Sequence, residues 1–314
     1  MERDLDVVVI CEINVDIVVT GLEGQPKFGA ELQVGNVVLA AGSSGVLTAT
    51  GLAALGLRVG VCGMVGDDVF GRHLLDHFDR WAIDRTGVVV RDDVATGASV
   101  ILTNPDDRAI LTNPGAMAVF SGAELRHDVV QRARHAHLSS YFLQTALQPD
   151  IIDVLRNLRS HGLTVSTDTG HDPAERWQTG SLLDNVDLFM PNEVEALAIS
   201  EQSTASNALE SFARCIPWVA IKRGGSGALA AHDTERVDLP SYGVSVVDTT
   251  GAGDAFDAGF LSGWLAGKDL ETCTRMGNAC GALTAAHLGG SGAITPERML
   301  SMVESTESRP ARRS

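Results

Sequence analysis

Residues 248–254 of this chain read Asp248-Thr-Thr-Gly-Ala-Gly-Asp254 and continue into Ala255 and Phe256. An apolar segment at residues 244–247 predicts a strand before them, and a helical pattern follows over residues 255–265. A glycine-rich turn between a strand and a helix leaves unpaired N–H groups at the positive helix end, which makes an anion site. Asp254 is a carboxylate inside that site. The combination predicts phosphoryl transfer, in which the N–H groups hold the phosphate and the acid accepts a proton.

The charge of the chain limits its partners. Its 314 residues include 24 Lys and Arg against 40 Asp and Glu, a net charge of −16. Such a chain is a poor candidate for binding nucleic acid or an anionic membrane surface. A phosphate site in it needs local positive charge, and a helix N-terminus contributes only about half a charge. We therefore expect a metal ion and a nearby Lys or Arg.

The termini and the cysteines indicate the compartment. The first residues, MERDLDVVVI, are acidic and enter a strand directly, so no secretory signal is visible, and no apolar run is long enough for a membrane span. The cysteines are odd in number and lack CxxC spacing: Cys11, Cys62, Cys215, Cys273 and Cys280. We expect reduced thiols and a cytoplasmic protein.

Strand-like and helical runs alternate through most of the chain. The expected strands lie at residues 7–10, 59–62, 137–140, 163–167, 186–190, 219–222 and 244–247. A capping box at Ser121 and Glu124 predicts a helix to about His135, and another helix is expected over residues 150–159. The alternation predicts an α/β fold with a doubly wound, mostly parallel sheet flanked by helices.

Two segments break this alternation, residues 13–40 and 95–112, and we call them the lid segments. They read as short strands with turn residues, and the turn at residues 104–107 resembles a hairpin connection. We expect them to form a small separate sheet that acts as a lid on one domain spanning residues 1–304. Residues 305–314 are polar and predict a disordered tail.

The better-known nucleotide and hydrolase motifs do not fit. The dinucleotide fingerprint would need a small residue where Phe256 stands, and Asp254 would face the pyrophosphate. No Walker A sequence occurs, because the stretch Gly263-Trp-Leu-Ala-Gly267-Lys-Asp269 has the wrong spacing. The nine histidines include no HExxH motif, because the pair His73 and His77 has the spacing but lacks the Glu, and no GxSxG elbow is present. A dehydrogenase and a metallo- or serine hydrolase are therefore disfavoured.

Several motifs in order over residues 5–300 together resemble the ribokinase-like (PfkB-type) carbohydrate kinases. Besides DTTGAGDAF, they are Glu12-Ile-Asn14-Val-Asp16, Ala41-Gly-Ser-Ser-Gly45, Val65-Gly-Asp-Asp68-Val-Phe-Gly71, Asn192-Glu-Val-Glu195, Lys222-Arg-Gly-Gly-Ser-Gly227 and Gly277-Asn-Ala-Cys-Gly-Ala282. The resemblance implies a ribokinase-like fold and a kinase that uses ATP and Mg²⁺.

The resemblance also assigns roles around the phosphates. It makes Asp254 the general base, and the anion hole is then formed by Gly251, Ala252 and Gly253. Glu195 matches the acidic residue of the family's NxxE motif, which holds magnesium through water. The nucleotide-binding positions that the resemblance implies are Asn192, Lys222, Gly224, Gly227, Thr249, Asn278 and Ala282. Family members often carry a small hydroxyl residue at the position of Lys222.

On the acceptor side, the resemblance assigns the sugar hydroxyls to Asp16, with Asn14 beside it in the same motif. Gly42 and Ser43 match paired glycines that let the sugar approach the backbone, with Ser43 in place of the second glycine. Leu47 stands where the family usually has an Asn. The sugar contacts therefore depart from the family pattern here.

The sequence thus predicts an ATP-dependent carbohydrate kinase that transfers the γ-phosphoryl group to a hydroxymethyl group of a sugar. A nucleoside kinase of the same fold and a non-catalytic sugar or nucleotide sensor are the alternatives. Pentoses, hexoses, keto-sugar acids and nucleosides are all open as acceptors. The resemblance further suggests a homodimer formed through the lid and a monovalent cation, K⁺, near Asp248.

Overall fold

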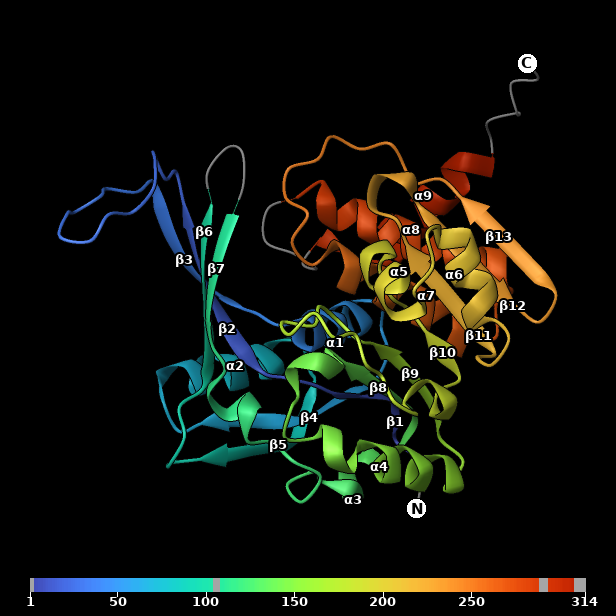
Figure 1. The fold of residues 1–314 in the computed structure, drawn as a ribbon, viewed down its shortest axis with the longest axis horizontal. Coiled ribbons are helices and arrows are strands. Elements are labelled where there is room, and N and C mark those ends of the chain that lie inside the picture. The colour runs from blue at the N-terminus through green and yellow to red at the C-terminus, as the bar shows by residue number, and fades with distance from the viewer. Residues whose placement is uncertain (1–2, 104–107, 288–292, 308–314) are drawn as a thin grey trace.

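The computed structural model describes residues 3–103, 108–287 and 293–307, and two sheets organise them (Figure 1). The main sheet has nine strands in the order β13-β12-β11-β10-β9-β8-β1-β4-β5. All pairs from β11 to β5 are parallel, whereas β12 and β13 run antiparallel at one edge. The small sheet has the order β3-β2-β6-β7. The predicted mostly parallel α/β sheet with a small separate sheet is confirmed.

The strands of the main sheet are β1 (Leu5–Ile10), β4 (Val59–Gly66), β5 (Asp84–Arg91), β8 (Ala133–Ser139), β9 (Thr164–Asp168), β10 (Leu188–Phe189), β11 (Trp218–Lys222), β12 (Ala228–His232) and β13 (Glu235–Leu239). Those of the small sheet are β2 (Asn14–Thr20), β3 (Asn36–Ala41), β6 (Gly97–Thr103) and β7 (Arg108–Asn113). The helices are α1 (Ser44–Ala54), α2 (Val69–Arg80), α3 (His127–Val130), α4 (Gln148–Ser160), α5 (Glu193–Ser200), α6 (Ala205–Phe212), α7 (Ala252–Leu265), α8 (Leu270–Ala285) and α9 (Pro296–Glu307).

Helices cover both faces of the main sheet and enclose two apolar layers. Buried side chains of α4 and α6 pack on one face, where Leu155 and Phe212 are examples. Buried side chains of α1, α2 and α7 pack on the other, where Leu52, Phe78 and Phe260 are examples. This arrangement agrees with near-continuous apolar strands such as β4, which is buried along its whole length. Among the helices that the structure describes, none is both long and apolar enough to cross a bilayer.

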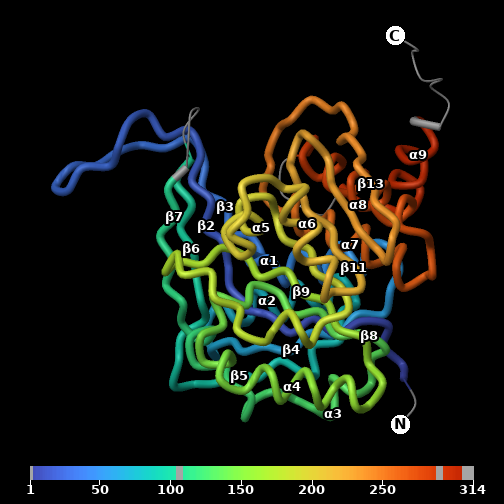
Figure 2. Tube along the Cα trace, turned by 45° about the vertical axis from the view of Figure 1, so that its right-hand side comes forward, coloured from blue at the N-terminus to red at the C-terminus, as the bar shows by residue number. Residues whose placement is uncertain are grey.

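The small sheet stands beside the body of the molecule, and its parallel β2–β6 pair joins the two lid segments (Figure 1). Figure 2 shows the connection between β2 and β3 projecting away from the rest of the chain. The expected turn at residues 104–107 lies outside the described residues. In the expected tail, α9 continues to Glu307, and residues 308–314 lie outside the described residues as well.

Two expectations for local structure were wrong. Residues 244–247 form no strand. Val246 and Val247 are about 60% exposed (64% and 59%), and the Val247 N–H donates to Ala285 O at the end of α8. The segment is apolar in sequence but has no sheet neighbour, so it runs as an irregular connection into the turn before α7.

The predicted helix over residues 121–135 is also absent. Ser121 and Glu124 do form their capping pair, with the Ser121 N–H donating to Glu124 Oε2 at 3.0 Å. Within residues 121–135, however, the only α-helix is α3. The chain then enters β8, which pairs with both β1 and β9. Pairing of a central strand on both sides therefore outweighs a local helix signal.

Candidate active site

Lys222, an expected site residue, and several acids gather at the carboxyl ends of the parallel strands. Asp168 is the last residue of β9, Lys222 is the last residue of β11, and Glu12 lies just beyond β1. In an open α/β sheet this edge is where ligands bind. The first turn of α7 lies over this edge of the sheet and carries Asp254.

The turn before α7 has the geometry of an anion site. Gly251 has φ +74°, a left-handed conformation that glycine adopts without strain, and α7 begins at the next residue. The N–H of Ala252 bonds to Thr249 O at 3.1 Å, while Gly253 is exposed. The helix start thus combines a positive dipole end with backbone open to solvent.

Asp254 is a buried acid in this first turn, with 9% of its surface exposed. Burial raises the pKa of Asp254 to about 7, and the negative charges of Asp168 and Asp16 also raise it, while Lys222 opposes the shift. Ser44 at the start of α1 hydrogen-bonds to the carboxyl group. The group can therefore be either protonated or ionised near neutral pH.

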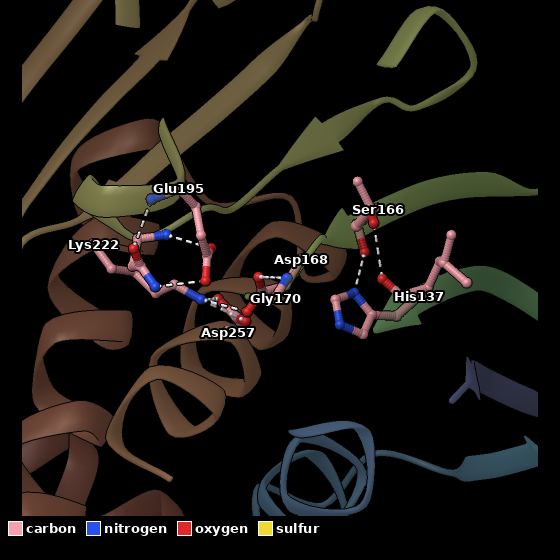
Figure 3. Close-up of polar contacts among 10 residues, drawn as sticks. His137, Ser166, Asp168, Gly170, Glu195, Lys222 and Asp257 are labelled. Carbon is pink, nitrogen blue, oxygen red and sulfur yellow. Dashed lines mark hydrogen bonds and ion pairs between the residues drawn. The ribbon is translucent and has the colours of Figure 1, made fainter. Parts of the chain in front are cut away.

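Beneath the turn, Lys222 forms a buried ion cluster with two acids (Figure 3). Its Nζ lies 2.7 Å from Asp168 Oδ2 and 2.9 Å from Asp257 Oδ2. Burial alone would lower the pKa of Lys222, but the two carboxylates hold it above its usual value. Lys222 lowers the pKa of Asp168, whereas burial raises that of Asp257. The lysine expected near the phosphates thus lies in the protein interior, where two acids offset its positive charge.

Asn192 and Glu195 form the capping box of α5. Glu195 Oε2 accepts the Asn192 N–H at 3.0 Å, and Oε1 accepts the side-chain amide of Asn192 at 2.6 Å. Burial and, next to it, the neighbouring charge of Asp168 raise the pKa of Glu195 to about 8. The charges of Glu195 and Asp168 repel each other, and a cation bound near Glu195 would offset that repulsion.

The residues present suit magnesium better than a metal held by protein ligands alone. Within the described ranges, no group of three or more His, Cys, Asp or Glu side chains could hold a metal ion. Mg²⁺ typically binds through one or two carboxylates together with waters and substrate phosphates. Glu195 and the adjoining Asp168 meet that requirement.

The expected acceptor residues lie together where β2 begins and β3 ends. The side-chain amide of Asn14 donates to Asp16 Oδ1 at 3.3 Å, and burial raises the pKa of Asp16 to about 6. A Cβ on Gly42 would lie 2.3 Å from Asp16 Oδ1, so a larger residue would displace the carboxylate. Ser43 has φ +74° and ψ 144°, a conformation that suits the glycine expected there. Its hydroxyl donates to Glu12 O at 2.8 Å.

The expected nucleotide positions divide into two groups. Gly224 begins the short helical turn after β11 and Gly227 follows it, and both have positive φ. A Cβ on Gly227 would lie 2.0 Å from Leu239 O, so only glycine fits there. Thr249 is exposed in the turn before α7.

Asn278 and Ala282 lie one turn apart on α8. The Asn278 amide donates to Pro240 O at 3.2 Å, so it ties α8 to the connection after β13. Asn278 also lines a cavity of about 550 Å³ together with Tyr242 and Arg275. A planar group of nucleobase size can be accommodated in that volume.

Four residues of this cluster received no functional role from the sequence: Asp168, Asp257, Glu12 and Ser44. Two local signals existed. Asp257 follows Asp254 by three residues and so shares its helix face, and Asp168 ends a buried strand in the stretch Ser166-Thr-Asp-Thr. Neither signal identifies Lys222 as the partner, because that contact joins residues far apart in sequence.

The chain matches the family model "pfkB family carbohydrate kinase" over residues 3–298. It belongs to the pfkB family of carbohydrate kinases. An uncharacterized sugar kinase of Archaeoglobus fulgidus is 35% identical over 73% of this chain and 91% of its own length. An ATP-dependent ribose-1-phosphate kinase of Halopiger xanaduensis is 31% identical over 87% and 89% of the two chains. The predicted family and the assignment as a sugar kinase are confirmed.

The fold is shared with solved structures. An Escherichia coli protein described as a ribokinase II, in complex with ATP and Mg²⁺, superposes with a TM-score of 0.84 at 24% identity. The similarity covers 96% of this chain and 99% of that one. The predicted ribokinase-like fold is therefore confirmed.

Proposed function

We propose that this pfkB kinase transfers the γ-phosphoryl group of ATP to a hydroxymethyl group of a sugar, with Asp254 as general base. The observation that carries the proposal is the buried Asp254 carboxyl group, whose pKa is raised to about 7, in the first turn of α7. A base works best when its pKa lies near the operating pH, because it is then largely ionised and still binds a proton well.

The surrounding backbone would stabilise the moving phosphoryl group. The N–H groups of residues 251–253 would form the anion hole at the start of α7, where the helix dipole adds positive potential; the Ala252 N–H would exchange its bond to Thr249 O for a phosphoryl oxygen. Lys222 lies directly below, because a Cβ on Gly253 would be 3.8 Å from its Nζ. Phosphoryl transfer is achieved mainly by positioning and charge stabilisation, and these groups provide both.

We propose that ATP binds between the turn after β11 and α8, with Asn192, Gly224, Gly227 and Thr249 near the phosphates. The adenine would lie at the Asn278 cavity beside Ala282. Glu195 and Asp168 would hold Mg²⁺, which neutralises charge on the phosphates when bound. The E. coli relative described above was crystallised with both ATP and Mg²⁺, which supports this assignment.

For the acceptor we propose a sugar whose hydroxyls bind Asp16 near Asn14, Gly42 and Ser43. A carboxylate can accept hydrogen bonds from two neighbouring hydroxyls. The nucleoside alternative needs an aromatic clamp, and Phe28, the aromatic residue of the lid segments, is fully exposed. The intact pair of Asp254 and Glu195 disfavours a sensor that has lost turnover.

We further propose that residues 1–304 act as one kinase domain and that the lid segments close over the sugar to exclude water. Exposed apolar side chains on the small sheet support a homodimer formed through the lid; they are Val37, Val38, Leu39, Ile110 and Leu111. A cytoplasmic location and a monovalent cation near Asp248 complete the proposal.

A turnover screen tests the function. Purified protein is given Mg²⁺ and ATP, and ADP formation is measured with D-ribose, D-fructose, ribose 1-phosphate, a 2-keto-3-deoxy sugar acid and adenosine in turn. We expect ADP formation that depends on one of the sugars and doubles when the enzyme is doubled. ATP binding without acceptor-dependent turnover would favour the sensor, and turnover with adenosine alone would favour the nucleoside kinase.

A further inference from the structure

The ion cluster at Lys222 connects parts of the site that are distant in sequence. Its Nζ bonds to Asp168 at the end of β9 and to both carboxylate oxygens of Asp257 on α7, at 3.0 and 2.9 Å. Its backbone N–H donates to Pro191 O at 2.9 Å, directly before the capping box of α5. One residue thus touches the helix that carries Asp254, the strand that carries Asp168, and the segment that leads to Glu195.

Stability alone is a poor explanation for this cluster. Lys222, Asp168 and Asp257 are all buried, with exposures of 8%, 7% and 0%. Removing two or three charges from water costs much of what their attraction gains, so a buried ion pair contributes little net stability compared with an apolar packing of similar volume. Such a cluster does fix geometry, because breaking it leaves an uncompensated charge in the interior.

The geometry that it fixes is that of the reacting end of α7. Asp257 lies three residues after Asp254 and therefore faces the same side of the helix. Lys222 holds Asp257 from below and lies within van der Waals reach of the position of a Cβ on Gly253. A shift of the first turn would move the base and the N–H groups together.

We propose that Lys222 is a positioning residue for phosphoryl transfer, which holds Asp254 and the Gly253 turn against the ends of β9 and β11 by bridging Asp168 and Asp257. The proposal rests on the proposed role of Asp254. Its consequence is that Lys222 affects the chemical step more than the binding of either substrate, because it acts through the groups that surround the moving phosphoryl.

The first test compares Lys222→Met with Lys268→Met. Lys268 is an exposed lysine just after α7, so its loss controls for the removal of one positive charge near that helix. With the best acceptor of the screen, we expect kcat of Lys222→Met to fall by roughly 10²-fold, which is the order expected for a misplacement of about 1 Å. KM for ATP and for the acceptor should stay within about threefold, because losing an interaction that acts only in the transition state leaves ground-state binding unchanged. Lys268→Met should match the wild type.

Two further variants separate positioning from folding. Val219→Ala lies in the same strand, is fully buried and should lower the melting temperature without lowering kcat at 25 °C. The double variant Lys222→Met with Asp257→Asn replaces the buried acid that has lost its lysine by a neutral amide, so it should regain melting temperature relative to Lys222→Met while kcat stays low. If the single variant does not fold, this double variant supplies the kinetic comparison.

The proposal is overturned if Lys222→Met folds and retains kcat within about threefold of the wild type. It is also overturned if the double variant recovers kcat together with its melting temperature, because Lys222 would then serve only stability. Asp254→Asn is measured in the same assay. Wild-type turnover of that variant would refute the base assignment, whereas a loss of kcat in Asp254→Asn with full activity in Lys222→Met would refute the Lys222 proposal alone.

Discussion

The raised pKa of Asp254 predicts a pH profile that can be measured on the wild-type enzyme. Only the ionised carboxylate can accept the proton of the acceptor hydroxyl. With a pKa of about 7, roughly a tenth of the enzyme is ionised at pH 6 and a hundredth at pH 5. An ordinary solvent-exposed aspartate, with its pKa near 3.8, would be almost fully ionised at both values. We therefore expect kcat/KM to rise with pH, about tenfold per unit between pH 6 and 7 and more steeply below pH 6, where Asp16 is protonated as well, and to level off above pH 7.

The assay is kcat/KM for the acceptor at saturating ATP and Mg²⁺ between pH 5 and 9, because this parameter reports the groups of the enzyme before the acceptor binds. Asp16 and Asp168 raise the pKa of Asp254 and Lys222 lowers it. Lys222→Met should accordingly move the rise to higher pH, while Lys268→Met leaves it in place. A profile that is flat from pH 5 to 8 would refute the reasoning.

Three further outcomes follow from the acceptor region and the core. Gly42→Ala places a Cβ 2.3 Å from Asp16 Oδ1, so KM for the sugar should rise by about tenfold or more while KM for ATP is unchanged; equal changes in both would contradict the assignment of Asp16. Ser43→Gly and Ser43→Ala lose the same hydroxyl, but only glycine relieves the backbone strain at φ +74°. Denaturant titration should therefore find the glycine variant more stable than the alanine variant by about 1–3 kcal/mol. Burial lowers the pKa of His137 to about 4. Below about pH 6.5, His137 therefore binds a proton in the unfolded chain but stays neutral in the folded protein. Between pH 6.5 and 4 this group alone should cost about 3 kcal/mol of unfolding free energy, and His137→Asn should reduce that slope; an unchanged slope would contradict the neutral His137.

The turn at residues 248–254 and the alternation of strands and helices were sufficient to predict the reaction class and the main sheet. Both are local patterns, since a glycine-rich helix start and a two- or 3.6-residue periodicity are visible within a short window. The same local reasoning was wrong for residues 244–247, because an apolar run forms a strand only where a neighbouring strand is available. It was also wrong for residues 121–135, where pairing of β8 on both edges outweighs the capping box.

The ion cluster could not be predicted because its members meet only after folding. Lys222 was expected on a nucleotide-binding loop from its place before Gly224. Its partners come from another strand and from a helix, at sequence separations of 54 and 35 residues. The strained Ser43 likewise becomes visible only through its backbone angles, although a glycine was expected at that position.

The central claim is that Asp254 removes the proton from the acceptor hydroxyl, and the direct test is the turnover of Asp254→Asn. Asparagine keeps the size and shape of the side chain but cannot accept that proton. We predict that kcat falls by about 10²–10⁴-fold while ATP still binds, as measured by calorimetry with Mg²⁺ present. Turnover near that of the wild type, with the same acceptor, would contradict the account.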